Sequence, residues 1–278
     1  MAGKRPMLNG IVNRIQYIGV ELEGGWDKSP DYPIEPDNSV TWHGPDGPTP
    51  PQTIRTAGGR IVPVLTGHPT PGAIPPPRYS GEVVSPRSPN LLTPETYAAW
   101  VRKVYPHHVN DTCGLHVHMS FYHKLNYSRL MSPDFTPYMI EALKVWGKKA
   151  GIAEGHMFWN RLNPDHPWTQ RHCTHLFLGD KQATIRKKDY NSRGTDHSRY
   201  TFINYCASQH STVECRGLPM FGGRPTVPTD SEVAINAIAA VLDATNRFLS
   251  KVRQIERSVS VTVPIRPPVS LEFGTTIR

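Results

Sequence analysis

The chain has 278 residues, with 31 Lys and Arg against 23 Asp and Glu, a formal charge of +8 and an apolar fraction of 37%. This length fits one large domain or two small ones, and no run approaches the roughly 20 apolar residues of a membrane-spanning helix. The first ten residues lack the apolar core of a signal peptide, and four cysteines without a CxxC pair argue against a disulfide scaffold, so we expect a cytoplasmic protein with reduced thiols.

The first predicted element is a strand near the N-terminus. Residues Ile15 to Glu23 read IQYIGVELE, in which apolar and polar side chains alternate as they do along a half-buried strand. A Pro/Gly-rich excursion follows at about 24–77, with strand fragments at Ser39 to Trp42 and at Arg60 to Leu65. We expect the excursion to fold over the edge of a site within a single domain spanning 1–278.

Helices and strands alternate in the middle of the chain. Pro94 stands at the first position of a predicted helix that ends near Val104. Strands are predicted at Arg78 to Ser85 and at Cys113 to Tyr122, and a second helix within Pro133 to Ala150. The inward residues predicted for this second helix are Tyr138, Ile140, Leu143, Val145 and Trp146. The segment from Glu154 to Tyr190 carries no clear pattern.

The C-terminal third predicts a hairpin and a long helix. Arg199 to Tyr205 and Thr212 to Leu218 form two strands with a polar link, and a helix runs from Ser231 to about Ile255. One more strand is predicted at Ser258 to Ile265. Strands interleaved with helices but joined partly by hairpins favour an α+β fold with a mainly antiparallel sheet.

Four predicted strands carry ionisable residues on one face. They are Glu21 and Glu23, Glu82, His116 and His118, and Glu214 and Arg216. Side chains at i and i+2 share a face about 6.6 Å apart, and carboxylates gathered there without a counter-ion would destabilise the fold. Carboxylates with imidazoles and no thiolate pair suit Mg²⁺ or Mn²⁺, which commonly meet phosphate oxygens. The pattern therefore favours an ATP-dependent reaction.

The blocks IGVELEGG, GEVVSP, CGLHVHMS and VECRGLP, in this order, resemble the glutamine-synthetase-like amidoligases. These are carboxylate–amine ligases similar to glutamine synthetase and the guanidino kinases, and some are encoded by phages. The resemblance implies a curved, mainly antiparallel sheet with helices packed on one face. It also implies ATP- and Mg²⁺-dependent amide or peptide bond formation through an acyl phosphate, joining a carboxylate substrate to an amine substrate that is a small molecule, a peptide or a protein.

The same resemblance implies a role for each motif residue. One metal would be held by Glu21, His116 and Glu214, and the other by Glu23 and Glu82. The nucleotide would be lined by His118 and Ser120. Phosphate oxygens would be bound by Arg216 and Arg199, with Arg193 as a weaker candidate. Glutamine synthetase has a further glutamate eight residues after the equivalent of Glu82, where this chain has Asn90. The second metal is therefore expected to be weakly held or completed by substrate.

The sequence is compatible with other interpretations. The same Glu/His face could activate water in a metal-dependent hydrolase, and the pI of 9.4 is compatible with a non-catalytic nucleic-acid-binding protein. Each motif also has a plain structural explanation, such as a solvated acidic edge or a cross-strand ion pair between Glu214 and Arg216. Assembly into a homo-oligomer is open as well.

Overall fold

The computed structural model describes residues 7–8, 11–35, 37, 40, 42–44, 47–49, 52–55, 61–64, 77–86, 94–173, 175, 201–206, 212–222 and 229–262. Its centre is an open, antiparallel five-stranded sheet in the order β10-β11-β9-β3-β8. The five strands are β3 (Ile15–Trp26), β8 (Tyr79–Val84), β9 (Gly114–Phe121), β10 (Ile203–Cys206) and β11 (Thr212–Pro219). The α+β class and the antiparallel sheet predicted from the sequence are confirmed.

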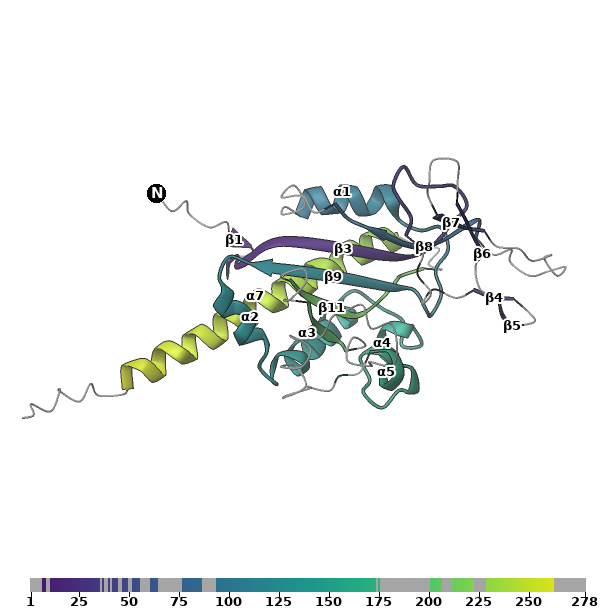
Figure 1. Ribbon diagram of the computed structural model, residues 1–278. Helices are drawn as coiled ribbons and strands as arrows, with labels where there is room; N and C mark the ends of the chain where they lie inside the picture. Colours follow the sequence, from purple (N-terminus) through teal and green to yellow (C-terminus); the bar gives the residue numbers. More distant parts are fainter. Residues whose placement is uncertain are drawn as a thin grey trace, which may run out of the picture.

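Helices complete the described part of the fold (Figure 1). They are α1 (Pro94–Val104), α2 (Lys124–Leu130), α3 (Phe135–Lys149), α4 (Met157–Arg161), α5 (Pro167–His172) and α7 (Asp230–Thr262). The bounds of α1 agree with the prediction. The short helix α2 was not predicted, and α4 and α5 lie in the segment that showed no clear pattern.

The excursion at 24–77 contributes small hairpins. Its strands are β4 (Trp42–Gly44), β5 (Gly47–Thr49), β6 (Gln52–Arg55) and β7 (Ile61–Val64), which pair as β4-β5 and β6-β7. The fragment predicted at Arg60 to Leu65 contains β7. Of the fragment predicted at Ser39 to Trp42, the structure describes Val40, which is in no strand, and Trp42, which begins β4. A further two-stranded pair, β1 (Met7–Leu8) with β2 (Ile11–Val12), precedes the sheet.

The apolar face of the sheet packs on α7, which crosses behind β3 and β9 in Figure 1. Val20, Leu22 and Val117 are fully buried, and the hydroxyl of Thr245 on α7 donates to the sulfur of Met119 on β9. Because side chains alternate along a strand, burying Met119 against α7 places His118 on the opposite face. The face that bears the motif residues therefore points away from α7.

Two predictions about helices were wrong. Val145 of α3 is 53% exposed, because the buried side of this helix is built from Phe135, Met139 and Leu143. Residues 258–262 were predicted as the start of a strand but continue α7. Within the helix, the hydroxyl of Ser258 donates a hydrogen bond to the carbonyl of Ile255. The rest of that predicted strand lies outside the described residues.

Candidate metal centre

Register in the sheet brings the motif residues of the three central strands together. Glu21 of β3 is directly opposite His116 of β9, and His118 of β9 is directly opposite Glu214 of β11. Paired residues in an antiparallel ladder point to the same face with their Cβ atoms about 5 Å apart. Three segments far apart in the sequence thus place four ionisable side chains side by side.

The edge strand β8 and the excursion add further carboxylates. Glu82 of β8 is directly opposite Glu23 of β3. On the outer side of β8, Glu35 forms an isolated bridge with Glu82, in which each backbone N–H donates to the other residue's carbonyl at 2.9 Å or less. This bridge brings Asp37, two residues further on, to Glu23 and Glu82. A residue of the Pro-rich excursion therefore joins the site.

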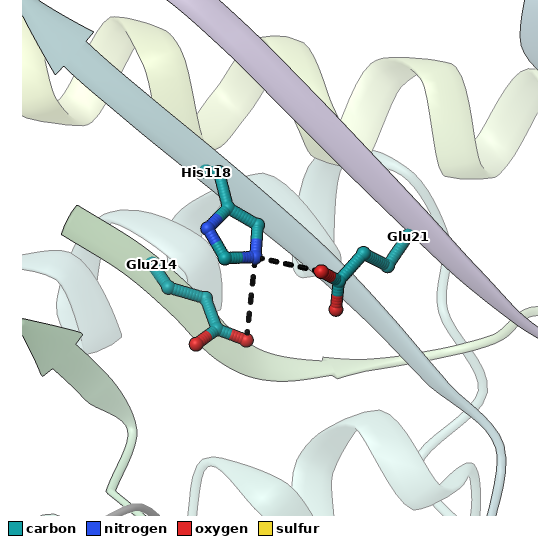
Figure 2. Close-up of side chains that lie close together, drawn as sticks. All are labelled: Glu21, His118 and Glu214. Atoms are coloured by element: carbon teal, nitrogen blue, oxygen red, sulfur yellow. Dashed lines mark ion pairs between the residues drawn. The ribbon is translucent and has the colours of Figure 1, made fainter. Parts of the chain in front are cut away.

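Glu21, His118 and Glu214 form what we call the first ligand group (Figure 2). Nε2 of His118 lies 3.0 Å from Oε1 of Glu21 and 3.7 Å from Oε1 of Glu214. Within the described part of the chain, this buried Nε2 has no partner in good hydrogen-bonding geometry. Adjacent ligands of an octahedral Mg²⁺ with 2.0–2.1 Å bonds lie about 3.0 Å apart and opposite ligands about 4.1 Å apart. The first separation fits adjacent ligands of one ion, and the second lies between the two values.

The imidazole of His118 is also oriented by a contact at its other ring nitrogen. Its Nδ1 lies 3.2 Å from the hydroxyl oxygen of Thr212 on β11. If Nδ1 carries the proton and donates it to this hydroxyl, Nε2 presents a lone pair toward Glu21 and Glu214. A partner on the far ring nitrogen is the usual way in which proteins fix the tautomer of a metal-binding histidine.

Glu23, Asp37 and Glu82 form the second ligand group, with one ligand atom of each within 4.8 Å of the others. Glu23 is 2% exposed, and its Oε2 accepts a short hydrogen bond from the backbone N–H of Gly114. The group contains carboxylates only, which are the ligands of hard cations such as Mg²⁺ and Mn²⁺.

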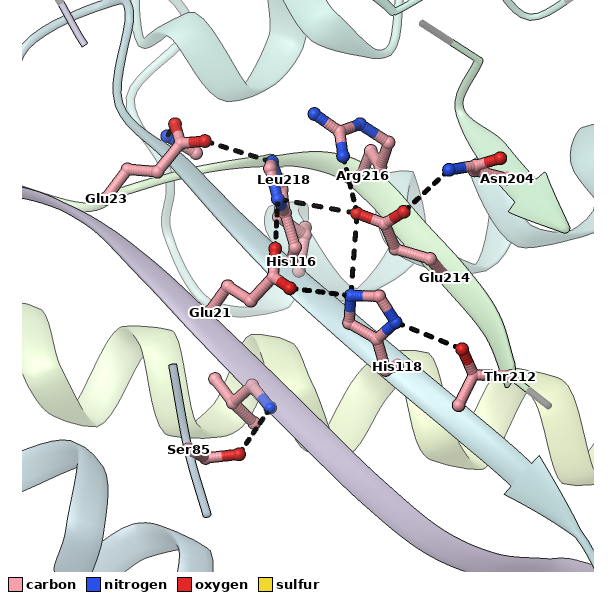
Figure 3. A network of polar contacts seen from close by, with 12 residues as sticks. Glu21, Glu23, Ser85, His116, His118, Asn204, Thr212, Glu214, Arg216 and Leu218 are labelled. Carbon is pink, nitrogen blue, oxygen red and sulfur yellow. Dashed lines mark hydrogen bonds and ion pairs between the residues drawn. The ribbon is translucent and has the colours of Figure 1, made fainter. Parts of the chain in front are cut away.

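His116 lies between Glu23 of the second ligand group and the carboxylates of the first, Glu21 and Glu214 (Figure 3). Its Nδ1 is 3.0 Å from Oε2 of Glu21 and 3.4 Å from Oε1 of Glu214, while its Nε2 is 3.6 Å from Oε1 of Glu23. The resemblance had implied His116 as a metal ligand and His118 as a residue lining the nucleotide. In the structure both imidazoles reach Glu21 and Glu214, and only His116 also contacts the second ligand group.

The carboxyl groups of the first ligand group favour the ionised form. Burial raises the pKa of Glu21, but the imidazoles of His116 and His118 outweigh this and hold it well below its ordinary value. Burial likewise opposes ionisation of Glu214, and Arg216 with the two imidazoles lowers its pKa overall. Burial lowers the pKa of His118, whereas Glu21 and Glu214 raise it, and the net shift is upward. The first ligand group is thus largely charge-compensated.

The second ligand group is not compensated in this way. Burial, together with the negative charges of Glu21, Asp37, Glu23 and Glu35, raises the pKa of Glu82 to about 9. Burial and the neighbouring Asp37 also raise the pKa of Glu23, against the opposing effect of His116. Carboxylates held close together without a cation resist ionisation in this manner. The chemistry of this group is therefore suited to a bound divalent ion.

Arg216 lies on the β11 strand next to this cluster. Its Nη1 donates to Oε1 of Glu214 over 2.7 Å, and the amide of Asn204 on β10 donates to the other oxygen, Oε2, over 2.8 Å. Burial lowers the pKa of Arg216, but the surrounding carboxylates Glu214, Glu23 and Glu21 raise it well above its ordinary value. The guanidinium is therefore a fixed positive charge at the rim of the first ligand group.

The remaining predicted site residues are placed as follows. Ser120 lies two residues after His118 on β9, on the same face of the sheet. It is opposite Tyr17, and its hydroxyl oxygen accepts a hydrogen bond from the backbone N–H of Tyr17 over 3.2 Å. Arg193, Arg199 and Asn90 lie outside the described residues.

Sequence reasoning missed three residues of the site. Asn204 and Thr212 belong to the predicted hairpin, and their alternation with the apolar Ile203 and Val213 was a usable signal for side chains on the motif face. Asp37 had no comparable signal, because its position follows from the bridge between Glu35 and Glu82 rather than from a periodic pattern.

Comparison with protein-family models, curated proteins and solved structures gives no match to the chain. None of the described helices is long and apolar enough to cross a membrane.

Proposed function

We propose that the protein is an ATP- and Mg²⁺-dependent carboxylate–amine ligase of the glutamine-synthetase-like type. The observation that carries the proposal is the convergence of two ligand groups from five chain segments on the face of an antiparallel sheet that points away from α7. The four motif blocks and their order support the same family. Two divalent ions about 3.5–4 Å apart are a common device for stabilising a transferring phosphoryl group.

The residues present fit such ions. Glu21, His118 and Glu214 would hold one, Glu23, Asp37 and Glu82 the other, and His116 would contact both groups. Asp37 would supply a further carboxylate to the second ligand group, for which the resemblance had left no third glutamate because this chain has Asn90 there. When bound, the ions would neutralise phosphate charge and orient the γ-phosphoryl group toward the carboxylate substrate.

The chain's own groups would supply the rest by position and charge. Arg216, held against Glu214, would meet phosphate oxygens at the rim of the first ligand group, as would Arg199 in the proposal. Ser120 would flank the nucleotide on β9 next to the metal-binding His118, with Arg193 as a further candidate. Transfer of the γ-phosphoryl group gives an acyl phosphate, which the amine opens to an amide with release of phosphate. No covalent bond to the protein is required.

The test is ADP release in the presence of Mg²⁺, ATP, a panel of carboxylates, and hydroxylamine as a small amine. We expect ADP and a hydroxamate in equal amounts, and a fall in rate of at least about 100-fold in Glu214→Gln. Glutamine is chosen because alanine would leave the half-buried guanidinium of Arg216 without its hydrogen-bond partner and would destabilise the fold. Glu256→Gln, which removes a carboxylate from an exposed ion pair with Arg129, is the matched control and should retain full activity.

Two results would overturn the proposal. The first is amide or ester hydrolysis that needs the cation but no ATP, which would identify a metal-dependent hydrolase. The second is salt-sensitive binding to DNA with no effect of ATP on the melting temperature.

A further inference from the structure

Arg161 is a buried arginine outside the motif strands. It ends the short helix α4, is 1% exposed, and its guanidinium lies over the ring of Trp168 at 4.1 Å from the centroid. Within the described residues it forms no ion pair with a carboxylate. Burying a charge in this way is unfavourable and lowers the pKa of the Arg161 guanidinium. The cost of burying this charge must therefore be offset by the groups that the guanidinium contacts.

The guanidinium binds main-chain carbonyls where two motif strands meet. Nη1 donates to the carbonyl of Leu218 on β11 over 2.7 Å, and Nη2 donates to the carbonyls of Cys113 and Asp111 over 2.9 and 3.0 Å. Cys113 immediately precedes β9. Arg161 therefore fastens the end of β11 to the start of β9, beside the candidate site.

The peptide between Cys113 and Gly114 connects Arg161 to the second ligand group. Its carbonyl oxygen accepts from Arg161 and from the backbone N–H of Met220, the latter over 3.0 Å, and its N–H donates to Oε2 of Glu23. A peptide whose carbonyl is bound by a cation is a stronger donor at its N–H, because the peptide is polarised along its length. The guanidinium thus acts on Glu23 through one peptide unit.

Gly114 allows this arrangement. A Cβ on Gly114 would lie 2.6 Å from Nε2 of His116 and 2.9 Å from Oε2 of Glu23. The side chains of His116 and Glu23 therefore pack directly against the Cys113–Gly114 peptide, to which Arg161 is hydrogen-bonded. With no side chain in between, the N–H of that peptide bonds directly to Oε2 of Glu23 and helps to fix the position of the carboxylate.

We propose that Arg161 is a positioning residue that fixes Glu23 for cation binding at the second ligand group, through the Cys113–Gly114 peptide. The proposal rests on the proposed function only in requiring that both ligand groups bind cations. It goes beyond that function by assigning a cation-binding role to a residue that touches neither ion nor substrate.

The experiment is a two-site Mn²⁺ titration of the whole protein, followed by electron paramagnetic resonance and calorimetry. In Arg161→Met we expect affinity at the second ligand group to fall by about 10-fold or more, the range found when an outer partner of a metal ligand is lost, while the first ligand group keeps its affinity. Arg161→Lys, which retains a cation that can donate to the same carbonyls, should recover part of the loss.

Arg14→Met is the matched control. Arg14 is also a buried arginine, 8% exposed, but it lies at the far end of the sheet, where its side chain donates to Ser250 of α7. We expect this variant to lower the melting temperature while both Mn²⁺ sites keep their affinity.

The outcomes separate the two proposals. Unchanged affinity at both sites in Arg161→Met, or an equal loss at both sites matched by Arg14→Met, would show that Arg161 only supports the fold and would overturn the inference. If Arg161→Met fails to fold, Arg161→Gln decides, because a folded glutamine variant carries no cation, and wild-type affinity at the second site would then also overturn the inference. Absence of Mn²⁺ binding by the wild-type protein would instead contradict the proposed function itself.

Discussion

Cation affinity at the second ligand group is expected to rise about tenfold for each pH unit between about pH 7 and pH 9. The reason is Glu82, whose pKa burial and the nearby carboxylates raise to about 9, so that at pH 7 it carries a proton that a cation must displace. Two pH units of competition weaken binding about 100-fold, or about 2.7 kcal/mol. Glu82→Gln removes this titrating proton, so the cation affinity should vary less with pH, although the second ligand group also loses one carboxylate ligand.

The assay is Mg²⁺ titration by calorimetry in two buffers of different ionisation enthalpy. At pH 7 the wild-type protein should release about one proton more than Glu82→Gln on filling both ligand groups. Identical proton release by the two proteins, or an affinity at the second ligand group that does not change between pH 7 and pH 8.5, would refute the reasoning.

The cation-free protein gives an independent check of the same group. The pKa of Glu82 is higher in the folded protein than its ordinary value of 4.5, so the folded state binds this proton more tightly than the unfolded state does. Its contribution to stability is therefore largest below about pH 4.5 and is lost as the pH rises toward 9. With a chelator present to remove divalent cations, the melting temperature should fall more steeply between pH 4.5 and pH 9 for the wild-type protein than for Glu82→Gln.

Three further predictions concern packing and the support of the site. Leu143→Ala, at a fully buried position of α3, should lower the free energy of unfolding by about 2–5 kcal/mol in urea, whereas Val145→Ala, at an exposed position, should change it by less than about 0.5 kcal/mol. Gly114→Ala should cost about 1–3 kcal/mol and weaken Mn²⁺ binding, because its Cβ would lie 2.6 Å from the ring nitrogen of His116; wild-type affinity would contradict the packing described. Thr212→Val should weaken Mn²⁺ binding at the first ligand group about 10- to 100-fold in the same titration, and no change would show that the hydroxyl does not orient the imidazole.

The strands that carry the candidate site could be predicted because their two faces differ so strongly. In β3 the fully buried Val20 and Leu22 alternate with Glu21 and Glu23, and this alternation located the strand and the face that bears the carboxylates. Pro94 marked the first turn of α1 because proline fits that position of a helix. Local patterns were sufficient wherever one side of an element is apolar.

Features that depend on long-range contacts could not be predicted in this way. Asp37 reaches the second ligand group through a backbone bridge to a strand 47 residues further along the chain, between Glu35 and Glu82. Arg161 is buried against the carbonyls of two other segments, although an arginine read in isolation is expected at the surface. The α7 helix passes through a β-branched stretch that local propensity favours as a strand, which explains the wrong prediction at Ser258.

In the proposed function, the carboxylates and imidazoles on this face of the sheet bind divalent cations next to a nucleotide. The most direct measurement is the anomalous scattering of Mn²⁺ in crystals grown with a non-hydrolysable ATP analogue. We expect two peaks, one among Glu21, His118 and Glu214 and one among Glu23, Asp37 and Glu82, with the analogue's phosphates beside them. No peak on this face, with these side chains paired only to one another, would contradict it.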